Sequence, residues 1–231
     1  FMSHADSLSN SIWLDKWLGE LQVSYPANSI NTSSLKNSVF LDPSKDLKSI
    51  KIPELKKEIS PIVFGCDNQI NEVHAFAMFD YYYSKGGKVF DTAYIYNHGL
   101  SDKYLGEWIN SRDLNDVVVL GKGAHTPDCL PDKIKPQIEE SMSRGNLDKL
   151  DIYCLHRDNL DVPVTEFIDA LNECKKDGLI DMLGASNWEL ERFKSANEYA
   201  ENQEKEGFKV LSNNFSLARM IEPVWPGCFS C

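Results

Sequence analysis

Short runs of apolar and β-branched residues recur along the chain from residue 62 onward. The six runs are IVFG (62–65), KVFDTA (88–93), VVVLGK (117–122), DIYCLH (151–156), IDMLGAS (180–186) and KVLSNN (209–214). Successive runs start 26 to 34 residues apart, and they are apolar nearly throughout. Strands of a parallel sheet that helices cover on both faces have this composition. The pattern therefore predicts six parallel strands.

Helical patterns lie between these runs. Apolar residues at helical spacing include Ile134, Ile138 and Met142 in one segment and Phe167, Leu171 and Cys174 in another. The candidate helix caps are Asn71, Ser101 and Asn187 at the starts, with Gly145 and Gly178 after the ends.

Strand–helix alternation of this length fits either a (β/α)8 barrel or an open doubly wound sheet. The segment GCDNQINE (65–72) after the first strand lacks the Gly-rich phosphate loop that would favour the open sheet. We expect an α/β fold, a TIM-type (β/α)8 barrel with six of its eight strands present.

Residues 1–60 differ from the rest. SIWLDKWLGEL (11–21) has the spacing of a short amphipathic helix, and the segments after it are rich in turn formers and mixed charges. We expect an N-terminal extension, a linker or the tail of a fused upstream domain over 1–60, and the barrel over 61–231. The chain starts with Phe1 and stops without a closing helix, so we expect a fragment that ends before the last two strands.

The composition is that of a globular protein, with 42% hydrophobic and 26% charged residues. With 24 basic and 35 acidic residues the net charge is −11, which argues against nucleic acid as a partner, because phosphate binding relies on clustered Lys and Arg. No apolar run reaches the roughly 20 residues that cross a bilayer, so we expect no membrane partner.

Six cysteines are present, at positions 66, 129, 154, 174, 228 and 231. The chain begins without the basic and apolar regions of a secretory signal, and Cys154 and Cys174 fall in apolar segments where Cys acts as a small core residue. These features predict the reducing cytoplasm. Cys228 and Cys231 form a lone C-x-x-C, which we interpret as two ordinary thiols because a zinc site needs a second pair; no metal site is expected.

Polar residues follow the predicted strands. Asp91 and Tyr96 follow the second strand, Lys122 ends the third and His156 follows the fourth. In a barrel these strand ends meet at one mouth, where the chemistry of the fold gathers. An ammonium beside a Tyr stabilises its phenolate and eases release of its proton to a carbonyl oxygen, a carboxylate can hold that Lys, and a His can orient the same oxygen.

Each residue alone has a structural alternative. Asp91 can cap its loop, Lys122 can lie on the rim and His156 can be a hydrogen-bonded core histidine. Tyr94 competes with Tyr96 for the role of the acid. His125 is interpreted as an ordinary loop residue.

At these residues the sequence resembles the aldo-keto reductase family. FDTAYIYNHGLSDKYLGEWI (90–109) is similar to the family signature D-T-A-x-x-Y-G-x-S-E-x-x-L-G. DKLDIYCLHRD (148–158) resembles L-D-x-x-D-L-Y-x-x-H, and KKDGLIDMLGASNWELERF (175–193) resembles K-x-G-K-I-R-x-x-G-x-S-N. The resemblance runs from about residue 61 to 226.

The resemblance implies a catalytic tetrad and a nicotinamide site. The tetrad is Asp91, Tyr96, Lys122 and His156. Ser186 and Asn187 would hold the nicotinamide carboxamide, with Ser212 or Asn214 beneath the ring where the family usually has Gln. The implied cofactor is NADPH, with NADH possible, since the last two loops, which carry the adenosine site in this family, are not in this sequence.

Two further departures concern the mouth. Asn97 and His98 replace the usual Gly after the tyrosine, and Gly121 precedes Lys122 where the family usually has Thr or Ser.

The function that follows is NAD(P)H-dependent reduction of an aldehyde, a ketone or a sugar-like carbonyl, with hydride transfer and Tyr96 as general acid. The partner is thus a small-molecule carbonyl. The alternative is a non-catalytic, nucleotide-binding regulatory module. A lyase that uses Lys122 as a Schiff base is a third class.

Overall fold

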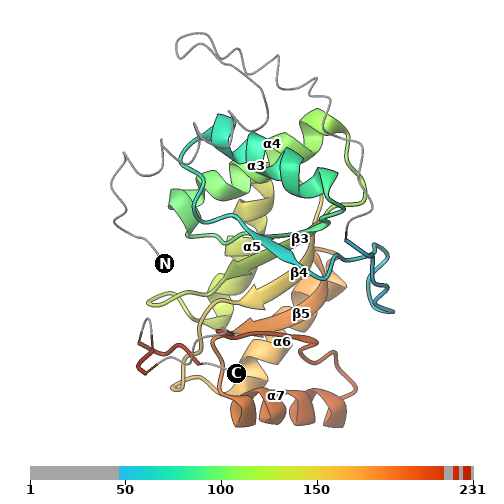
Figure 1. Ribbon diagram of the computed structural model, residues 1–231. Helices are drawn as coiled ribbons and strands as arrows, with labels where there is room; N and C mark the ends of the chain where they lie inside the picture. Colours follow the sequence, from blue (N-terminus) through green and yellow to red (C-terminus); the bar gives the residue numbers. More distant parts are fainter. Residues whose placement is uncertain (1–46, 216–220, 224–225, 230–231) are drawn as a thin grey trace, which may run out of the picture. The chain divides into compact units, whose positions relative to one another are not determined.

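The computed structural model of the chain describes residues 47–215, 221–223 and 226–229 (Figure 1). Six parallel strands pair in chain order: β1 (Val63–Gly65), β2 (Val89–Asp91), β3 (Val118–Gly123), β4 (Leu150–Leu155), β5 (Ile180–Ser186) and β6 (Val210–Ser212). The helices between them are α3 (Glu72–Ser84), α4 (Leu100–Arg112), α5 (Pro131–Gly145), α6 (Val164–Lys176) and α7 (Leu190–Asn202), and the 3-10 helix η1 (Tyr96–Gly99) precedes α4. The expected α/β fold is confirmed: the sheet curls into part of a (β/α)8 barrel.

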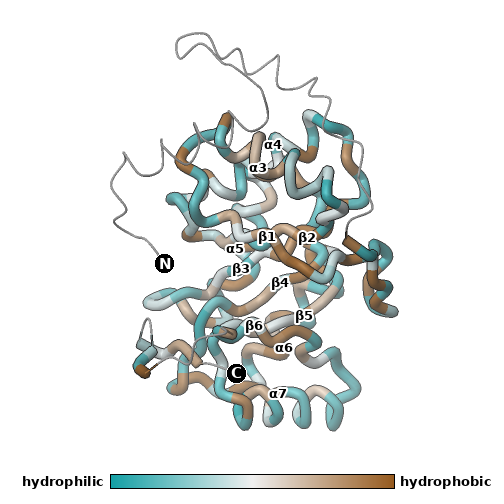
Figure 2. Tube along the Cα trace, in the orientation of Figure 1, coloured by the Kyte–Doolittle hydropathy of each residue, from teal (hydrophilic) through white to brown (hydrophobic). Residues whose placement is uncertain are grey.

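The strands alternate between an inner and an outer face. The inner strand residues form one apolar cluster, which Leu55 joins from the segment before β1: Val89, Val118, Leu120, Ile152, Cys154 and Met182. The residues between them, such as Phe90, Val119 and Tyr153, belong to the larger cluster beneath the helices. Strands β3 and β4 are thus buried on both faces, and β2 and β5 nearly so, as expected of strands that form continuous apolar runs. In Figure 2, β1 and β2 are drawn largely in brown, the colour of hydrophobic residues.

The helices pack in chain order along the outside of the sheet, each against the next (Figure 1). Helices α4 and α5 meet where Gly106 faces Gly145, because a Cβ added at Gly106 would lie 1.9 Å from the Gly145 carbonyl oxygen. Helix α7 carries hydrophobic and hydrophilic colours in alternation (Figure 2), as expected of a helix with one solvated face. None of the helices that the structure describes is long and apolar enough to cross a membrane.

Residues 50–59 close the amino-terminal end of this sheet. Ile50 and Ile59 pair in an antiparallel bridge, and Leu55 between them is buried against the inner strand residues. Lys57 donates to the Asp151 carboxylate at 2.9 Å and to the Val117 carbonyl oxygen at 2.7 Å. The described part of the segment before residue 60 therefore packs with the barrel. The domain assignment of 1–60 stays a prediction, and the expected helix at 11–21 lies outside the described residues.

The expected helix caps are only partly confirmed. Asn71 caps α3, its side chain accepting from the His74 N–H at 2.9 Å, and Gly178 follows the end of α6 with a φ of 77°. The prediction for Ser101 was wrong, because Gly99 precedes α4 and Ser101 lies buried inside it. Asn187 does not cap α7 either, since that helix begins at Leu190 after the N-cap residue Glu189.

Candidate functional site

The polar residues at the strand ends continue the inner face of the barrel. Side chains on one face of a strand recur every second residue. The inner residues Val89, Leu120, Cys154, Gly184 and Val210 are each followed, two positions later, by a polar residue. These polar residues are Asp91, Lys122, His156, Ser186 and Ser212. The register of the parallel sheet then carries all five to the carboxyl end of the strands.

Lys122 and Asp91 form a buried ion pair. The Lys122 ammonium contacts the Asp91 carboxylate, and the two side chains are only 6% and 19% exposed. Burial lowers the pKa of Lys122, but attraction to Asp91 and the contact with Tyr96 outweigh it, so the net shift is upward and Lys122 remains charged. Burial raises the pKa of Asp91, and the charge of Lys122 opposes that rise. Both residues thus lie where the sequence predicted, and they are paired.

Tyr96 lies beside this pair and beside His156. Its ring centroid is 4.9 Å from the Lys122 ammonium and 5.5 Å from the His156 ring, which meets it edge to face. The structure therefore brings the four residues of the predicted tetrad together.

The competing tyrosine points elsewhere. The Tyr94 hydroxyl donates to Glu140 on α5 at 2.8 Å, and the Arg144 guanidinium lies 4.3 Å from the centroid of its ring. Of the two tyrosines, Tyr96 is the one beside Lys122, and its role as the acid stays a prediction.

The turn after Tyr96 has an uncommon backbone. Asn97, His98 and Gly99 all have a positive φ, at 48°, 55° and 89°. The Asn97 amide stabilises this turn, donating to the Gln69 carbonyl oxygen at 3.3 Å and to the Ser101 hydroxyl at 3.0 Å. Asn is among the residues that tolerate the left-handed region. The departure from the family pattern at Asn97 and His98 thus occurs in a left-handed turn.

The electrostatics at Tyr96 differ from the expectation. Burial raises the pKa of Tyr96, and although Lys122 lowers it, Asp91 raises it again, so the net shift is upward. Burial therefore outweighs the stabilisation that Lys122 gives the phenolate, and Asp91 offsets part of that stabilisation. Tyr96 keeps its proton near neutral pH, as an acid must before it reacts.

His156 is fixed and neutral. Its backbone N–H donates to the Gly123 carbonyl oxygen at 2.6 Å, and the residue is 6% exposed. Burial lowers the pKa of His156 to about 2, with contributions from Lys122, His125 and Arg157. Its Nδ1 is buried and has no hydrogen-bond partner among the described residues. A core histidine would have that nitrogen bonded, so this observation speaks against the structural alternative for His156.

The residues predicted for the cofactor lie on the neighbouring strands. The Ser186 hydroxyl donates to the Ser212 carbonyl oxygen at 2.9 Å, and the Asn187 amide donates to the Ser186 hydroxyl at 3.0 Å and to the His156 carbonyl oxygen at 3.4 Å. Asn187 has a φ of 58°, in the left-handed region that Asn tolerates. Asn214 lies two residues beyond Ser212, and its N–H donates to the Phe229 carbonyl oxygen at 2.9 Å. Ser186, Asn187 and Ser212 therefore form one hydrogen-bonded group beside His156.

His125 belongs to the same neighbourhood, although the sequence suggested only a loop residue. Its ring lies edge to face against His156, with centroids 4.9 Å apart. The one signal in the sequence was its position three residues after Lys122, just past the end of β3.

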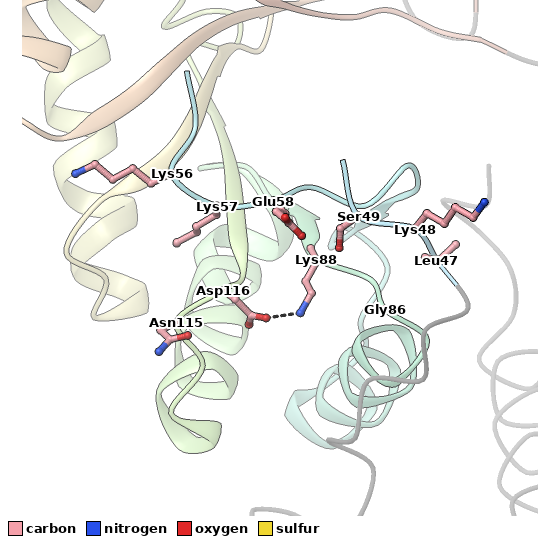
Figure 3. A pocket seen from close by; sticks show the side chains of 10 residues that line it. All are labelled: Leu47, Lys48, Ser49, Lys56, Lys57, Glu58, Gly86, Lys88, Asn115 and Asp116. Carbon is pink, nitrogen blue, oxygen red and sulfur yellow. Dashed lines mark hydrogen bonds and ion pairs between the residues drawn. The ribbon is translucent and has the colours of Figure 1, made fainter. Parts of the chain in front are cut away.

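A cavity at the opposite end of the strands contains none of these residues. Its volume is about 880 Å³, and its lining includes Lys88 and Asp116, which lie just before β2 and β3 (Figure 3). Figure 3 shows the ion pair of Lys88 and Asp116 across it, with Glu58 nearby. Because the chemistry of a barrel lies at the carboxyl ends of its strands, this cavity is not the candidate site.

The described cysteines carry no disulfide. Cys66, Cys129, Cys154 and Cys174 are buried free thiols, and burial raises the pKa of each. Cys154 lies inside the barrel as a small core residue, where a Cβ added at Gly184 would be 2.4 Å from its sulfur. Of the two cysteines predicted to be ordinary thiols at the end of the chain, Cys231 lies outside the described residues.

Curled parallel strands, outer helices and one polar mouth define a barrel protein with its chemistry at the carboxyl ends of the strands. The sequence model of the Aldo/keto reductase family matches residues 62–224. The chain therefore belongs to the aldo/keto reductase family, a family of oxidoreductases.

Three relatives illustrate the similarity. Norsolorinic acid reductase B of Dothistroma septosporum is 27% identical over 191 residues, covering 72% of this chain and 48% of the relative. A putative aryl-alcohol dehydrogenase of Saccharomyces cerevisiae is 26% identical, covering 66% of this chain and 45% of the relative. An aldo-keto reductase of Aspergillus calidoustus is 29% identical, covering 64% and 41%. The chain thus spans about half the length of the relatives that it matches.

Proposed function

We propose that this chain carries the catalytic half of an NAD(P)H-dependent carbonyl reductase, with NADPH as the preferred cofactor. The observation that carries the proposal is the contact of Tyr96 with both Lys122 and His156, in a mouth where Lys122 is held by Asp91. A tyrosine that keeps its proton, an ammonium and a neutral imidazole are together suited to an oxygen that gains charge as it is reduced.

The residues beside His156 suit a nicotinamide. A carboxamide offers one acceptor and two donors, and Asn187 carries a matching amide. Ser186 adds a hydroxyl that can both donate and accept, and it already holds the Asn187 amide at 3.0 Å. The reduced nicotinamide, when bound, supplies the hydride for the carbonyl carbon. Ser186 and Asn187 would hold its carboxamide, with Ser212 and Asn214 proposed to lie beneath its ring.

The chain's own residues supply the proton and the orientation. Tyr96 donates its phenolic proton to the carbonyl oxygen, so that hydride and proton together convert a C=O group into an alcohol. Lys122 stabilises the phenolate that Tyr96 becomes, since Lys122 stays charged against Asp91. His156 is neutral and can donate a hydrogen bond to the same oxygen, orienting it toward Tyr96.

The substrate class is a small aldehyde, ketone or sugar-like carbonyl. The names of two relatives, an aryl-alcohol dehydrogenase and a norsolorinic acid reductase, add aryl carbonyls to the compounds worth testing. The Tyr96 and His156 rings meet edge to face and form an aromatic wall against which a planar substrate can lie.

The experiment follows loss of reduced-nicotinamide absorbance by the full-length protein, first with NADPH and then with NADH, over a panel of aliphatic, sugar-like and aryl aldehydes. Tyr96→Phe should abolish turnover, whereas the matched control Tyr94→Phe should keep it, because Tyr94 faces Glu140. Saturable nucleotide binding without turnover of any carbonyl would instead favour the non-catalytic module.

A further inference from the structure

His125 lies at the edge of the proposed site without a role in the reaction described above. It is half-buried in the loop between β3 and α5, and its ring packs against His156 at 4.9 Å with an interplanar angle of 77°. The rings of Tyr96, His156 and His125 therefore follow one another, each edge to face with the next. His125 is therefore the next ring beyond His156 in this sequence of contacts.

The hydrogen bond that His125 makes fixes its tautomer. Its Nδ1 lies 2.9 Å from the Thr126 carbonyl oxygen. A carbonyl oxygen can only accept, so Nδ1 must carry the hydrogen, and in the neutral ring Nε2 is left as an acceptor. Within the described parts of the chain, Nε2 has no hydrogen-bond partner. The ring thus offers one free acceptor beside the site.

We propose that His125 determines substrate specificity by accepting a hydrogen bond from a hydroxyl on the carbon next to the reacting carbonyl. This inference rests on the proposed function, because it places the carbonyl oxygen at Tyr96 and His156. A free acceptor selects a donor, and a hydroxyl is the donor that small sugar-like and hydroxy-carbonyl compounds carry. A second carbonyl oxygen at that position could not bond Nε2 of His125, because both atoms are acceptors.

The spacing suits adjacent oxygens. Oxygens on neighbouring carbons lie about 3 Å apart, and a ring nitrogen bonds an oxygen at about 2.8 Å. Two rings with centroids 4.9 Å apart can therefore bind one oxygen each. The preferred substrates are 2-hydroxy aldehydes and 2-hydroxy ketones.

The test compares lactaldehyde with propanal, which share a carbon skeleton and differ in this hydroxyl. The ratio of kcat/KM for the two is measured with NADPH in the full-length protein and in three variants. His125→Phe keeps a ring against His156 and removes the acceptor. His125→Gln restores an acceptor, and Asp128→Asn is the control, since Asp128 is exposed in the same loop.

In His125→Phe the lactaldehyde-to-propanal ratio should fall about fivefold to tenfold, the effect of one lost hydrogen bond to a neutral group. Turnover of propanal should be retained, His125→Gln should recover part of the ratio and Asp128→Asn should leave it unchanged. An unchanged ratio in His125→Phe, or an equal loss for both aldehydes, would overturn the inference and assign His125 to packing against His156. If the wild-type protein oxidised NADPH with neither aldehyde nor any other carbonyl, the proposed function itself would fall, and the inference with it.

Discussion

The ammonium of Lys122 contacts the carboxylate of Asp91 across the neighbouring strands β2 and β3. The register pairs Asp91 with Leu120, two residues before Lys122, so both side chains point to the inner face. There, above the apolar cluster of Leu120, Val89 and Cys154, a buried charge needs a partner. The pair therefore links the stability of the barrel to its chemistry.

The first prediction separates the contribution of the Lys122–Asp91 pair to stability from its contribution to turnover. Lys122→Met should lower the free energy of unfolding by about 3 kcal/mol at neutral pH, because it leaves a buried carboxylate unpaired. Since burial raises the pKa of Asp91, the unpaired carboxyl takes up a proton as the pH falls, and the deficit should be smaller near pH 5. Urea unfolding at the two pH values measures this. The double variant Asp91→Asn/Lys122→Met should regain stability and stay inactive; recovery of activity would exclude a role for Lys122 in turnover.

The second prediction concerns the neutral state of His156. Its pKa is lowered from 6.5 to about 2 in the folded protein. Below about pH 6.5 His156 is therefore protonated in the unfolded chain and still neutral in the folded protein. Stability is lost as the pH falls through that range, by about 1 kcal/mol between pH 7.5 and pH 5.5 from this residue alone. His156→Asn should lose correspondingly less over the same interval. Burial also lowers the pKa of His74, but this effect is common to both proteins and cancels. Equal losses of unfolding free energy in the wild type and in His156→Asn would contradict a neutral His156 in the folded protein.

The third prediction concerns Leu55, which fills the amino-terminal end of the barrel. Leu55→Ala should cost about 3 kcal/mol of unfolding free energy, because it leaves a cavity against Val89 and Ile152. Lys51→Ala, an exposed change in the same segment, should cost almost nothing. A loss of less than about 1 kcal/mol for Leu55→Ala, measured by urea unfolding, would mean that this segment does not pack on the barrel in solution.

The fourth prediction tests the proposed cofactor residues. Ser186→Ala should raise the Kd for NADPH about fivefold to tenfold, since it removes the hydroxyl that holds the Asn187 amide. The fold should persist, because the Ser212 carbonyl oxygen still accepts from the Asn187 N–H at 3.3 Å. Quenching of tryptophan fluorescence reports the binding. Ser195→Ala, on the exposed face of α7, serves as the control, and an equal Kd in both variants would exclude Ser186 from the nucleotide site.

The sequence predicted the fold well because a buried parallel sheet leaves a strong pattern. The strands are mostly apolar on both faces, and the polar residue at the end of each of strands β2 to β6 continues the inner face two positions after an inner residue. That periodicity is local, so the sequence alone predicts that Asp91, Lys122 and His156 meet at one end of the sheet.

What the sequence missed depends on loops. Tyr94 and Tyr96 differ by only two positions, and their different partners, Glu140 for Tyr94 and Lys122 for Tyr96, arise only in the folded loop. His125 lies in a loop with no periodic signal, and only the three-dimensional arrangement brings it to His156. The upward direction of the pKa shift at Tyr96 depends on its burial, which only the structure shows. Lys122 alone would lower this pKa.

The most direct test of the central claim is a single turnover of bound NADPH. The full-length protein is preloaded with NADPH and mixed rapidly with a reactive aldehyde, and the loss of nicotinamide absorbance is compared between wild type and Tyr96→Phe. The account predicts NADPH affinities that agree within about twofold and a rate that falls by at least about 100-fold in the variant, the range expected for loss of a general acid. Equal single-turnover rates in the two proteins would contradict the assignment of Tyr96 as the acid.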